Sequence, residues 1–234
     1  MHRLTETPLP GTTVDPLYPS SSAAFGEDMS ESDWHTIAVI ALREVLLTFF
    51  AGRPDVYVAS QMFFYYEQGN PAAHRDPDVL VARGVRGNHF RHSFRLWEER
   101  VLPCTLFEMA SEKTWRSDVE EKGPLYERLG IPEFFLFDPE GVYLDPVFRG
   151  FRLRARRYVP IRPDSDGCLV SRRLGLKFRP EGGVLRVFNA TTGEPLLTPA
   201  ERADQQQQRA DAAEAELARL RAELARRPDA PGAR

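Results

Sequence analysis

The sequence predicts an α/β (α+β) protein in which helices flank a mixed central sheet, followed by a small antiparallel β extension and a C-terminal helix. Three observations support this class. Residues 33–50 show helical periodicity, a second helical segment separates strand-like runs at 102–109 and 134–137, and short strand-like runs fill 142–187. Because a helix joins two of the runs, we expect at least one strand–helix–strand crossover within the sheet.

Composition places the chain among ordinary globular proteins. Its 234 residues suffice for one sizeable domain with appendages, and 42% of them are apolar and 28% charged. The formal net charge of −3 gives no global basic field for nucleic acid. Cys104 and Cys168 form no disulfide framework, and neither a signal peptide nor a membrane-spanning run is recognisable. The expected location is therefore the cytoplasm, with no membrane partner.

Composition also divides the chain into four parts. Residues 1–28 are rich in Pro, Thr and Ser and predict a flexible leader, and 29–197 predict the folded domain. Residues 198–227 are rich in Ala, Glu, Arg and Leu and predict a helix or short coiled coil, and 228–234 predict a disordered tail.

The folded domain begins with a helix over 33–50, which follows several N-cap candidates. Its apolar residues recur at helical spacing: Trp34, Ile37, Ala38, Ala41, Leu42, Val45 and Leu46. Strands are expected at 56–67, 79–82 and 102–109, because the first of these runs is rich in β-branched and aromatic residues and the others are apolar. The polar stretch 83–100 predicts a loop that is partly helical.

The second half of the domain combines one helix with many strands. We expect the helix over 118–129 to be interrupted at Gly123-Pro124, because proline disfavours a helical conformation in the residue before it. The apolar run 134–137 is typical of a strand that is buried on both faces. Short antiparallel strands are expected at 144–148, 150–154, 156–161, 175–179 and 184–188.

The C-terminal segment predicts a helix that starts near Thr198-Pro199. Apolar residues in it alternate spacings of three and four with one gap: Ala203, Ala210, Ala213, Leu217, Leu220 and Leu224. This short heptad pattern favours a dimerising coiled coil and hence a homodimer. The alternative is a single solvated helix held by pairs of oppositely charged side chains.

Two acidic residues stand in strand-like surroundings, where an ionised carboxylate is costly to desolvate unless something pairs with it. Asp78 opens the second strand after Pro77, and Glu108 lies within the third. Two carboxylates that converge from neighbouring strands could share a divalent cation, and oxygen ligands suit Mg²⁺ or Mn²⁺. The alternative is one salt-bridged core acid and one turn acid.

A lysine near these acids could act on a phosphate or on the attacking water. Many metal-dependent nucleases carry one two residues after the strand glutamate, where this chain has Ala110. Lys122 on the following helix is the preferred substitute, and Lys113 in the loop is the other. Asp118 and Tyr126 share the helical face of Lys122. The alternative is a surface lysine that is paired with Asp118.

Other polar residues are accessory candidates. Ser111 and Thr114 could bind a phosphate or cap the next helix, and Gln61 could line the site or point outward. Either Glu31 or Asp33 could complete the metal shell. Four histidines show no metal-ligand spacing: His35, His74, His89 and His92.

Residues 149–179 are strongly basic. They contain ten Arg and Lys residues, against Asp164 and Asp166 as the acids, with aromatic residues interleaved. Such a stripe could contact DNA phosphates, and the candidate contacts are Arg152, Arg154, Arg156 and Arg157. The alternative is an exposed antiparallel face with alternating arginines.

Four segments occur in a specific order: Pro77-Asp78-Val79, Phe107-Glu108-x-x-Ser111-x-x-Thr114, Asp118-x-x-x-Lys122-x-x-x-Tyr126, and Gly130 to Pro139. Together they resemble the Uma-two family of bacterial restriction-endonuclease-like proteins, in the PD-(D/E)XK nuclease superfamily. The resemblance runs from about the first helix to residue 199. It implies a restriction-endonuclease-like core in 29–197, with Asp78 and Glu108 as metal ligands and Lys122 as the superfamily lysine. The chain departs from the family pattern at Glu112-Lys113 and Gly123-Pro124.

The sequence therefore predicts a metal-dependent DNA endonuclease that hydrolyses phosphodiester bonds through Asp78, Glu108 and Lys122. One alternative is a catalytically silent nuclease fold that binds nucleic acid or a protein partner. Another is a small-molecule metal hydrolase that uses the same site. Fold alone does not decide among these reactions.

Overall fold

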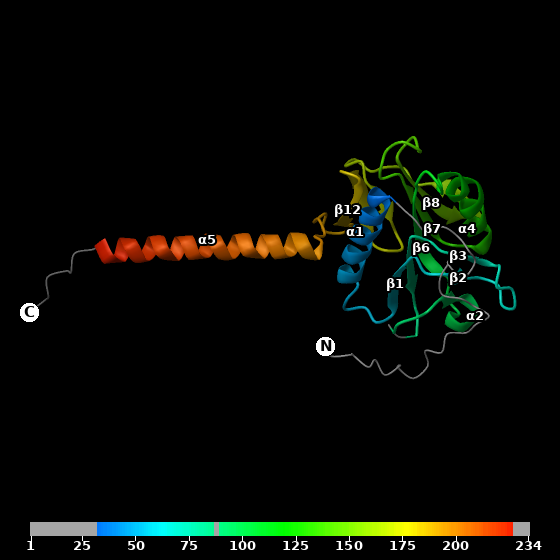
Figure 1. Ribbon diagram of the computed structural model, residues 1–234, viewed down its shortest axis with the longest axis horizontal. Helices are drawn as coiled ribbons and strands as arrows, with labels where there is room; N and C mark the ends of the chain where they lie inside the picture. The colour runs from blue at the N-terminus through cyan, green and yellow to red at the C-terminus, as the bar shows by residue number, and fades with distance from the viewer. Residues whose placement is uncertain (1–31, 87–88, 227–234) are drawn as a thin grey trace, which may run out of the picture. The chain divides into compact units, whose positions relative to one another are not determined.

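The computed structural model describes residues 32–86 and 89–226, which belong to two compact units that divide between Leu196 and Leu197. The first unit contains a six-stranded sheet with the order β1-β4-β6-β7-β8-β9 (Figure 1). Strands β6 and β7 run parallel and the other neighbours run antiparallel. The bounds are β1 Val56–Ser60, β4 Val79–Arg83, β6 Pro103–Met109, β7 Glu133–Phe137, β8 Phe148–Arg154 and β9 Arg157–Pro160.

The predicted fold class is confirmed, because helices flank this mixed sheet and both the antiparallel extension and the C-terminal helix are present. The predicted leader, 1–28, and the predicted tail, 228–234, lie outside the described residues, as does Glu31.

Helix α1 (Asp33–Phe49) covers one face of the sheet. The side chain of Ser32 caps it and accepts a hydrogen bond from the backbone N–H of His35 at 3.3 Å. Its buried face differs from the predicted apolar stripe, because Trp34 and Ile37 are 52% and 55% exposed. His35 takes a place on the buried face instead, where it is only 2% exposed.

The crossover from β6 to β7 is helical throughout. It consists of α3 (Trp115–Ser117), the π-helix η2 (Asp118–Lys122) and α4 (Gly123–Leu129). The predicted interruption at Gly123-Pro124 is wrong. The backbone N–H of Gly123 donates to the carbonyl of Asp118, five residues back, and this wide turn carries the helix past the proline.

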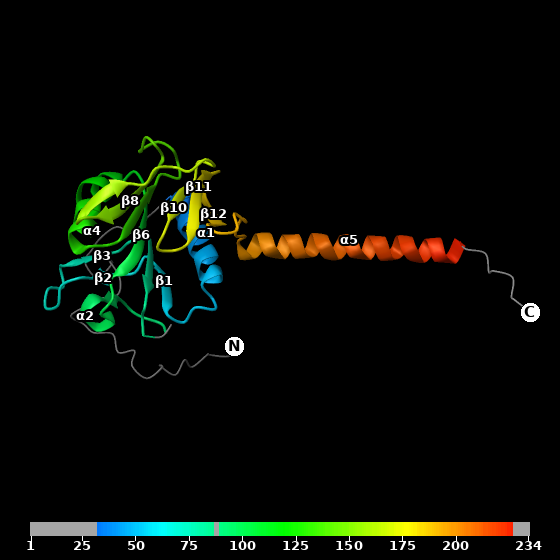
Figure 2. The ribbon, with the colours of Figure 1, turned by 180° about the vertical axis from the view of Figure 1, so that it is seen from behind.

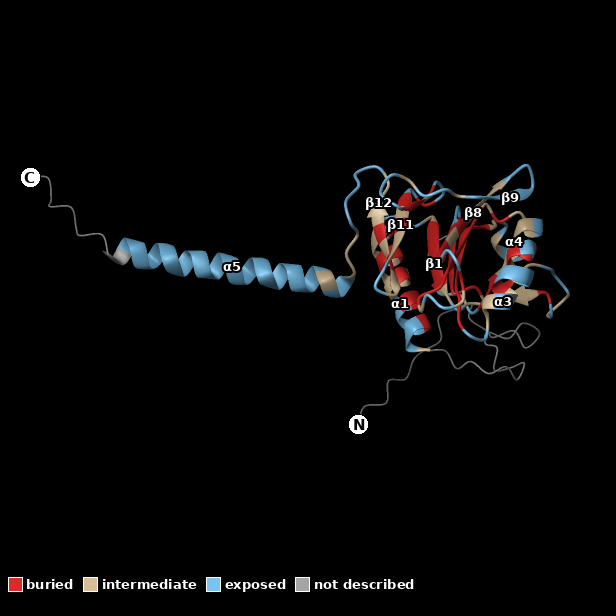
Figure 3. Ribbon diagram, turned by 90° about the horizontal axis from the view of Figure 1, so that it is seen from above, coloured by how far each residue is buried: buried red, intermediate tan, exposed pale blue. Residues whose placement is uncertain are grey.

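The two faces of the central sheet bury different side chains, as the alternation along β6 predicts. Phe107 and Met109 join the core under α1, whereas Leu106 and Ala110 join the core under α4. Figure 3 shows that buried residues concentrate in the strands of this sheet. Glu108 therefore points toward the α4 face and is completely buried there.

The expected strand 56–67 is broken at Gln61, which adopts a left-handed backbone conformation with φ of 47°. Residues beyond it enter a separate small sheet with the order β3-β2-β5. The stretch 83–100, expected to be a partly helical loop, contains one helical turn as expected and also contributes a strand to that sheet. The bounds are β2 Phe64–Tyr65, β3 His74–Arg75, β5 Phe94–Arg95 and α2 Leu96–Glu99.

The β-rich region after β7 divides into two parts. Strands β8 and β9 extend the central sheet as a hairpin, and 144–148 enters β8 only at Phe148. Strands β10 (Leu169–Ser171), β11 (Leu176–Glu181) and β12 (Val184–Asn189) form the antiparallel extension, which lies beside α1 (Figure 2).

Buried Glu133 joins the extension to the central sheet. Its carboxylate lies 2.9 Å from Nε of Arg152, and it also accepts hydrogen bonds from the Ser171 hydroxyl and from the backbone N–H groups of Arg172 and Arg173. A buried carboxylate with this many donors is fully compensated, so its role is structural.

The second unit contains helix α5 (Pro199–Arg226). Thr198 and Glu201 form a reciprocal capping box at its start, in which each side chain accepts from the other residue's backbone N–H. Leu217, Leu220 and Leu224 are 53%, 44% and 64% exposed. Within the described residues, no helix combines the length and the apolar character needed to cross a membrane.

Candidate active site

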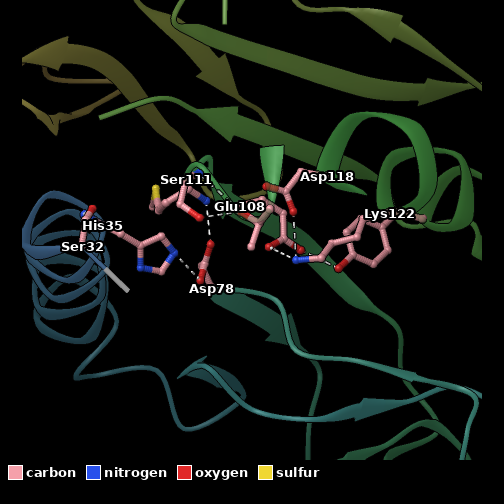
Figure 4. Close-up of polar contacts among 10 residues, drawn as sticks. Ser32, His35, Asp78, Glu108, Ser111, Asp118 and Lys122 are labelled. Carbon is pink, nitrogen blue, oxygen red and sulfur yellow. Dashed lines mark hydrogen bonds and ion pairs between the residues drawn. The ribbon is translucent and has the colours of Figure 1, made fainter. Parts of the chain in front are cut away.

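Asp78 and Glu108 lie opposite each other at one end of the central sheet. The antiparallel register pairs Val79 with Phe107, which places the two acids on directly facing positions. One oxygen of Asp78 accepts a hydrogen bond from the backbone N–H of Met109 at 2.6 Å. The other lies 3.0 Å from Nε2 of His35, which reaches across from α1 (Figure 4).

Glu108 is held by two side chains of the crossover helix. Nζ of Lys122 lies 2.9 Å from one carboxylate oxygen, and the hydroxyl of Tyr126 donates to the other at 2.6 Å. Nζ of Lys122 also lies 3.0 Å from Asp118. The lysine ammonium thus bridges two buried acids that come from different elements (Figure 4).

The cluster contains three acidic side chains and one lysine. Burial raises the pKa of Glu108 well above its ordinary value, although the charge of Lys122 opposes this, and burial raises the pKa of Asp118 as well. Burial lowers the pKa of Lys122, but the charges of Glu108, Asp118 and Asp78 more than offset this and raise it. Lys122 therefore pairs directly with Glu108 and Asp118, and Asp78 acts on it only as a more distant charge.

Two members of the cluster were not among the predicted site residues. Asp118 was considered only as a partner of Lys122, yet its carboxylate is buried and neither oxygen has a well-aligned hydrogen-bond donor in the described part of the chain. The i, i+4 spacing to Lys122 was the available signal for it. His35 had no such signal, because its partner Asp78 is 43 positions away and meets it only in the folded chain.

The donor atoms fit a hard divalent cation. All three acids supply oxygen, the ligand atom that such cations prefer, and a carboxylate oxygen can accept a second partner. Within the described residues, no group of three or more His, Cys, Asp or Glu side chains is arranged so that it could hold a metal ion. The remaining ligands of a bound ion would therefore come from water or substrate, as is usual for Mg²⁺.

The accessory candidates separate into buried and exposed residues. Ser111 is buried beside the acids, and its hydroxyl lies 3.1 Å from the Thr114 hydroxyl (Figure 4). Asp33 is exposed in the first turn of α1, and Lys113 is exposed in the turn after β6. Gln61 is not in mid-strand and its side chain is exposed, although its backbone N–H donates to the Asp78 carbonyl at 3.2 Å.

The predicted arginine stripe does not form one surface. Arg152 is bound to Glu133 and to the carbonyl of Val170, so it serves the fold. Arg157 lies 3.0 Å from Glu127 of α4. Arg154 and Arg156 are exposed around the β8–β9 turn. Arg152 and Arg154 share one face of β8, whereas Arg157 on β9 is paired with Glu127 of α4, and the spacing along the chain did not reveal these partners.

Comparison with known proteins identifies one family. A model of the Uma2 (Uma-two) family, described as a putative restriction endonuclease, matches residues 27–214 and confirms the resemblance in the segments quoted above. A solved structure, described as a putative nuclease belonging to DUF820 from Anabaena variabilis ATCC 29413, is 13% identical. That comparison covers 63% of this chain and 76% of the other, with a TM-score of 0.45. A search of curated proteins finds no match.

Proposed function

Because this chain belongs to the Uma2 family of restriction-endonuclease-like proteins, we propose that it is a metal-dependent endonuclease that hydrolyses phosphodiester bonds in DNA. The observation that carries the proposal is the cluster of Asp78, Glu108 and Asp118, in which Lys122 pairs with Glu108 and Asp118. Asp78 and Glu108 would hold Mg²⁺ or Mn²⁺. When bound, such an ion lowers the pKa of water and stabilises negative charge on a phosphate.

The protein's own side chains prepare this site in several ways. Lys122 keeps its proton because the neighbouring acids raise its pKa, so its ammonium can stabilise the charge that develops on the phosphate. Tyr126 and Lys122 fix the orientation of Glu108. His35 and the Met109 N–H fix that of Asp78. Hydrogen bonds of this kind, from neighbouring groups to a metal-binding carboxylate, hold it in the orientation that metal binding requires.

Cleavage of supercoiled plasmid DNA tests the proposal. We expect nicking or linearisation by the wild type with Mg²⁺ or Mn²⁺ and none with EDTA. Asp78→Ala should lower the rate by about 10²-fold, the scale typical of a lost transition-state contact. Asp55→Ala, at an exposed pair with Arg53, is the control and should cleave normally. Equal rates for the wild type and the Asp78 variant would eliminate the assigned site.

His35 is expected to matter through Asp78 and not through direct contact with DNA. His35→Ala should raise the Mg²⁺ concentration for half-maximal cleavage by about 10–100-fold, the usual effect of losing a group that orients a metal ligand. His35→Gln, which keeps a donor, should restore part of the loss. His92→Ala, at an exposed position, is the control. An unchanged Mg²⁺ dependence in His35→Ala would contradict the positioning role.

Contacts to DNA and to a second subunit complete the proposal. We assign phosphate contacts to the exposed Arg154 and Arg156 and to Arg157, with Arg152 as a partly buried support. The exposed leucines of α5 support a homodimer formed through this helix. Two buried free cysteines fit a cytoplasmic location.

A catalytically silent nuclease fold is the second candidate. The observation in its favour is that Lys122 is already held by two ion pairs, to Glu108 and Asp118. Binding of DNA without cleavage under any of the metal conditions above would favour it.

A further inference from the structure

Arginines line two adjoining hollows at the end of the central sheet that is remote from Glu108. The larger hollow has a volume of about 590 Å³ and is lined by four of them: Arg152, Arg154, Arg162 and Arg172. The second has about 430 Å³ and is lined by Arg83, Arg172 and Arg173. Because Arg172 lines both hollows, they form one continuous surface, which we call the arginine surface.

The positive charge of the arginine surface is poorly compensated. No acidic residue lines either hollow in the described part of the chain. Arg152 is paired with Glu133, and Arg83 donates to the backbone carbonyl of Arg173 at 2.6 Å. The guanidinium groups of Arg154, Arg162 and Arg172 have no ion pair or hydrogen bond with any described residue, and all three residues are exposed. Gathering like charges in this way costs free energy, which a bound anion would offset.

The strand registers separate this surface from the acidic cluster. Arg152 pairs with Glu133, whereas Glu108 lies level with Leu136, three residues further along β7. Three residues of a strand span about 10 Å. The faces differ as well, because Arg152 and Arg154 alternate in step with Phe148, which packs in the core under α1, while Glu108 faces α4. A phosphate at Glu108 therefore lies on the other side of the sheet from these arginines.

We propose that the arginine surface is a second nucleic-acid site, which binds backbone phosphates of DNA away from the cleavage cluster. The choice of DNA as the polyanion rests on the proposed function. Two hollows that share an arginine suit successive phosphates of a chain better than one isolated anion. The apolar side chains between the arginines, such as Val159, Ile161 and Val170, suit the sugars between those phosphates.

Binding of a 30-base-pair duplex in EDTA tests this site without any cleavage. The triple variant R154A/R162A/R172A should bind more weakly. The slope of log K against log salt concentration should become shallower by about 2.7, because each lost phosphate contact changes it by about 0.9. The control triple R128A/R209A/R221A removes the same charge from exposed positions outside the hollows. Its slope of log K against log salt concentration should stay closer to that of the wild type than the slope of R154A/R162A/R172A does. Thermal unfolding of both variants shows whether they remain folded.

The outcomes separate this site from the proposed function. If R154A/R162A/R172A loses DNA affinity and salt dependence and the control triple does not, the arginine surface is supported, whether or not the wild type cleaves DNA. Equal losses in the two triple variants would reduce the effect to net charge and overturn the proposal. Unchanged DNA binding in R154A/R162A/R172A would also overturn it. So would a result in which pyrophosphate protects the wild type, but not this variant, against thermal unfolding while the variant keeps its DNA affinity.

Discussion

Replacing Glu108 by glutamine is expected to abolish DNA cleavage, with a loss of about 10³-fold or more, the upper range for a group that stabilises developing charge. The amide keeps the shape of the side chain and can still accept the Tyr126 hydroxyl. It cannot carry the negative charge that a divalent cation requires. Plasmid cleavage in Mg²⁺ and in Mn²⁺ measures the loss.

The same variant should change how stability depends on pH. Burial raises the pKa of Glu108 in the folded protein above its value of about 4.5 in the unfolded chain. The folded state therefore binds the proton more tightly, so this group favours folding below pH 4.5 and the benefit is lost as the pH rises through the folded pKa. Relative to the wild type, E108Q should become more stable as the pH rises from 4.5 to 8.

Denaturant unfolding in EDTA at a series of pH values measures this difference. E112Q removes a neighbouring carboxylate that is exposed, and it should follow the wild type at each pH and cleave DNA. If Glu108 served only as one partner of a structural ion pair, E108Q would instead become less stable relative to the wild type as the pH rises, because its removal would destabilise the fold at neutral pH. An inactive E108Q whose relative stability rises with pH would show that the carboxylate is kept for chemistry.

Local patterns along the chain predicted most of the elements that hold this site. Strand alternation correctly placed Glu108 on the same face as Leu106 and Ala110, opposite Phe107 and Met109. The Asp118, Lys122 and Tyr126 spacing correctly placed three side chains on one side of the crossover helix, and these now meet around Glu108. Both inferences depend only on the periods of helices and strands, which tertiary packing rarely changes.

The sequence could not reveal features that depend on meetings between distant segments. His35 reaches Asp78 only because α1 packs across the end of the sheet, and nothing in the helical pattern marks that contact. Glutamine has no preference for the left-handed backbone conformation that Gln61 adopts. Tertiary contacts hold it there, such as the hydrogen bond from its backbone N–H to the Asp78 carbonyl. The pairing of Arg152 with Glu133 and of Arg157 with Glu127 likewise depends on segments that are distant in the sequence.

Lys122→Met is expected to destabilise the protein by about 3–5 kcal/mol at neutral pH, the usual cost of breaking a buried ion pair by removing one partner. The apolar chain of methionine fills a similar space, but Glu108 and Asp118 then face each other without a cation between them. Cleavage should be lost as well, because the ammonium that contacts Glu108 is removed. Denaturant unfolding and plasmid cleavage measure the two effects.

The pH dependence of this loss follows from the two acids. Both have raised pKa values, so they take up protons as the pH falls toward 4.5, and the variant should regain much of its stability there. In the wild type the raised pKa of Lys122 stabilises the fold below about pH 10.5, and this contribution disappears only as the pH rises through the folded value.

A second substitution distinguishes charge from packing as the cause. The double variant D118N/K122M removes one of the two unpaired acids and should recover part of the stability at neutral pH without recovering cleavage. Lys113→Met, at an exposed position nearby, should leave both stability and cleavage close to the wild type. If D118N/K122M were no more stable than K122M, the unpaired charge would not be the cause. The electrostatic account of the cluster, on which the metal site depends, would then fail.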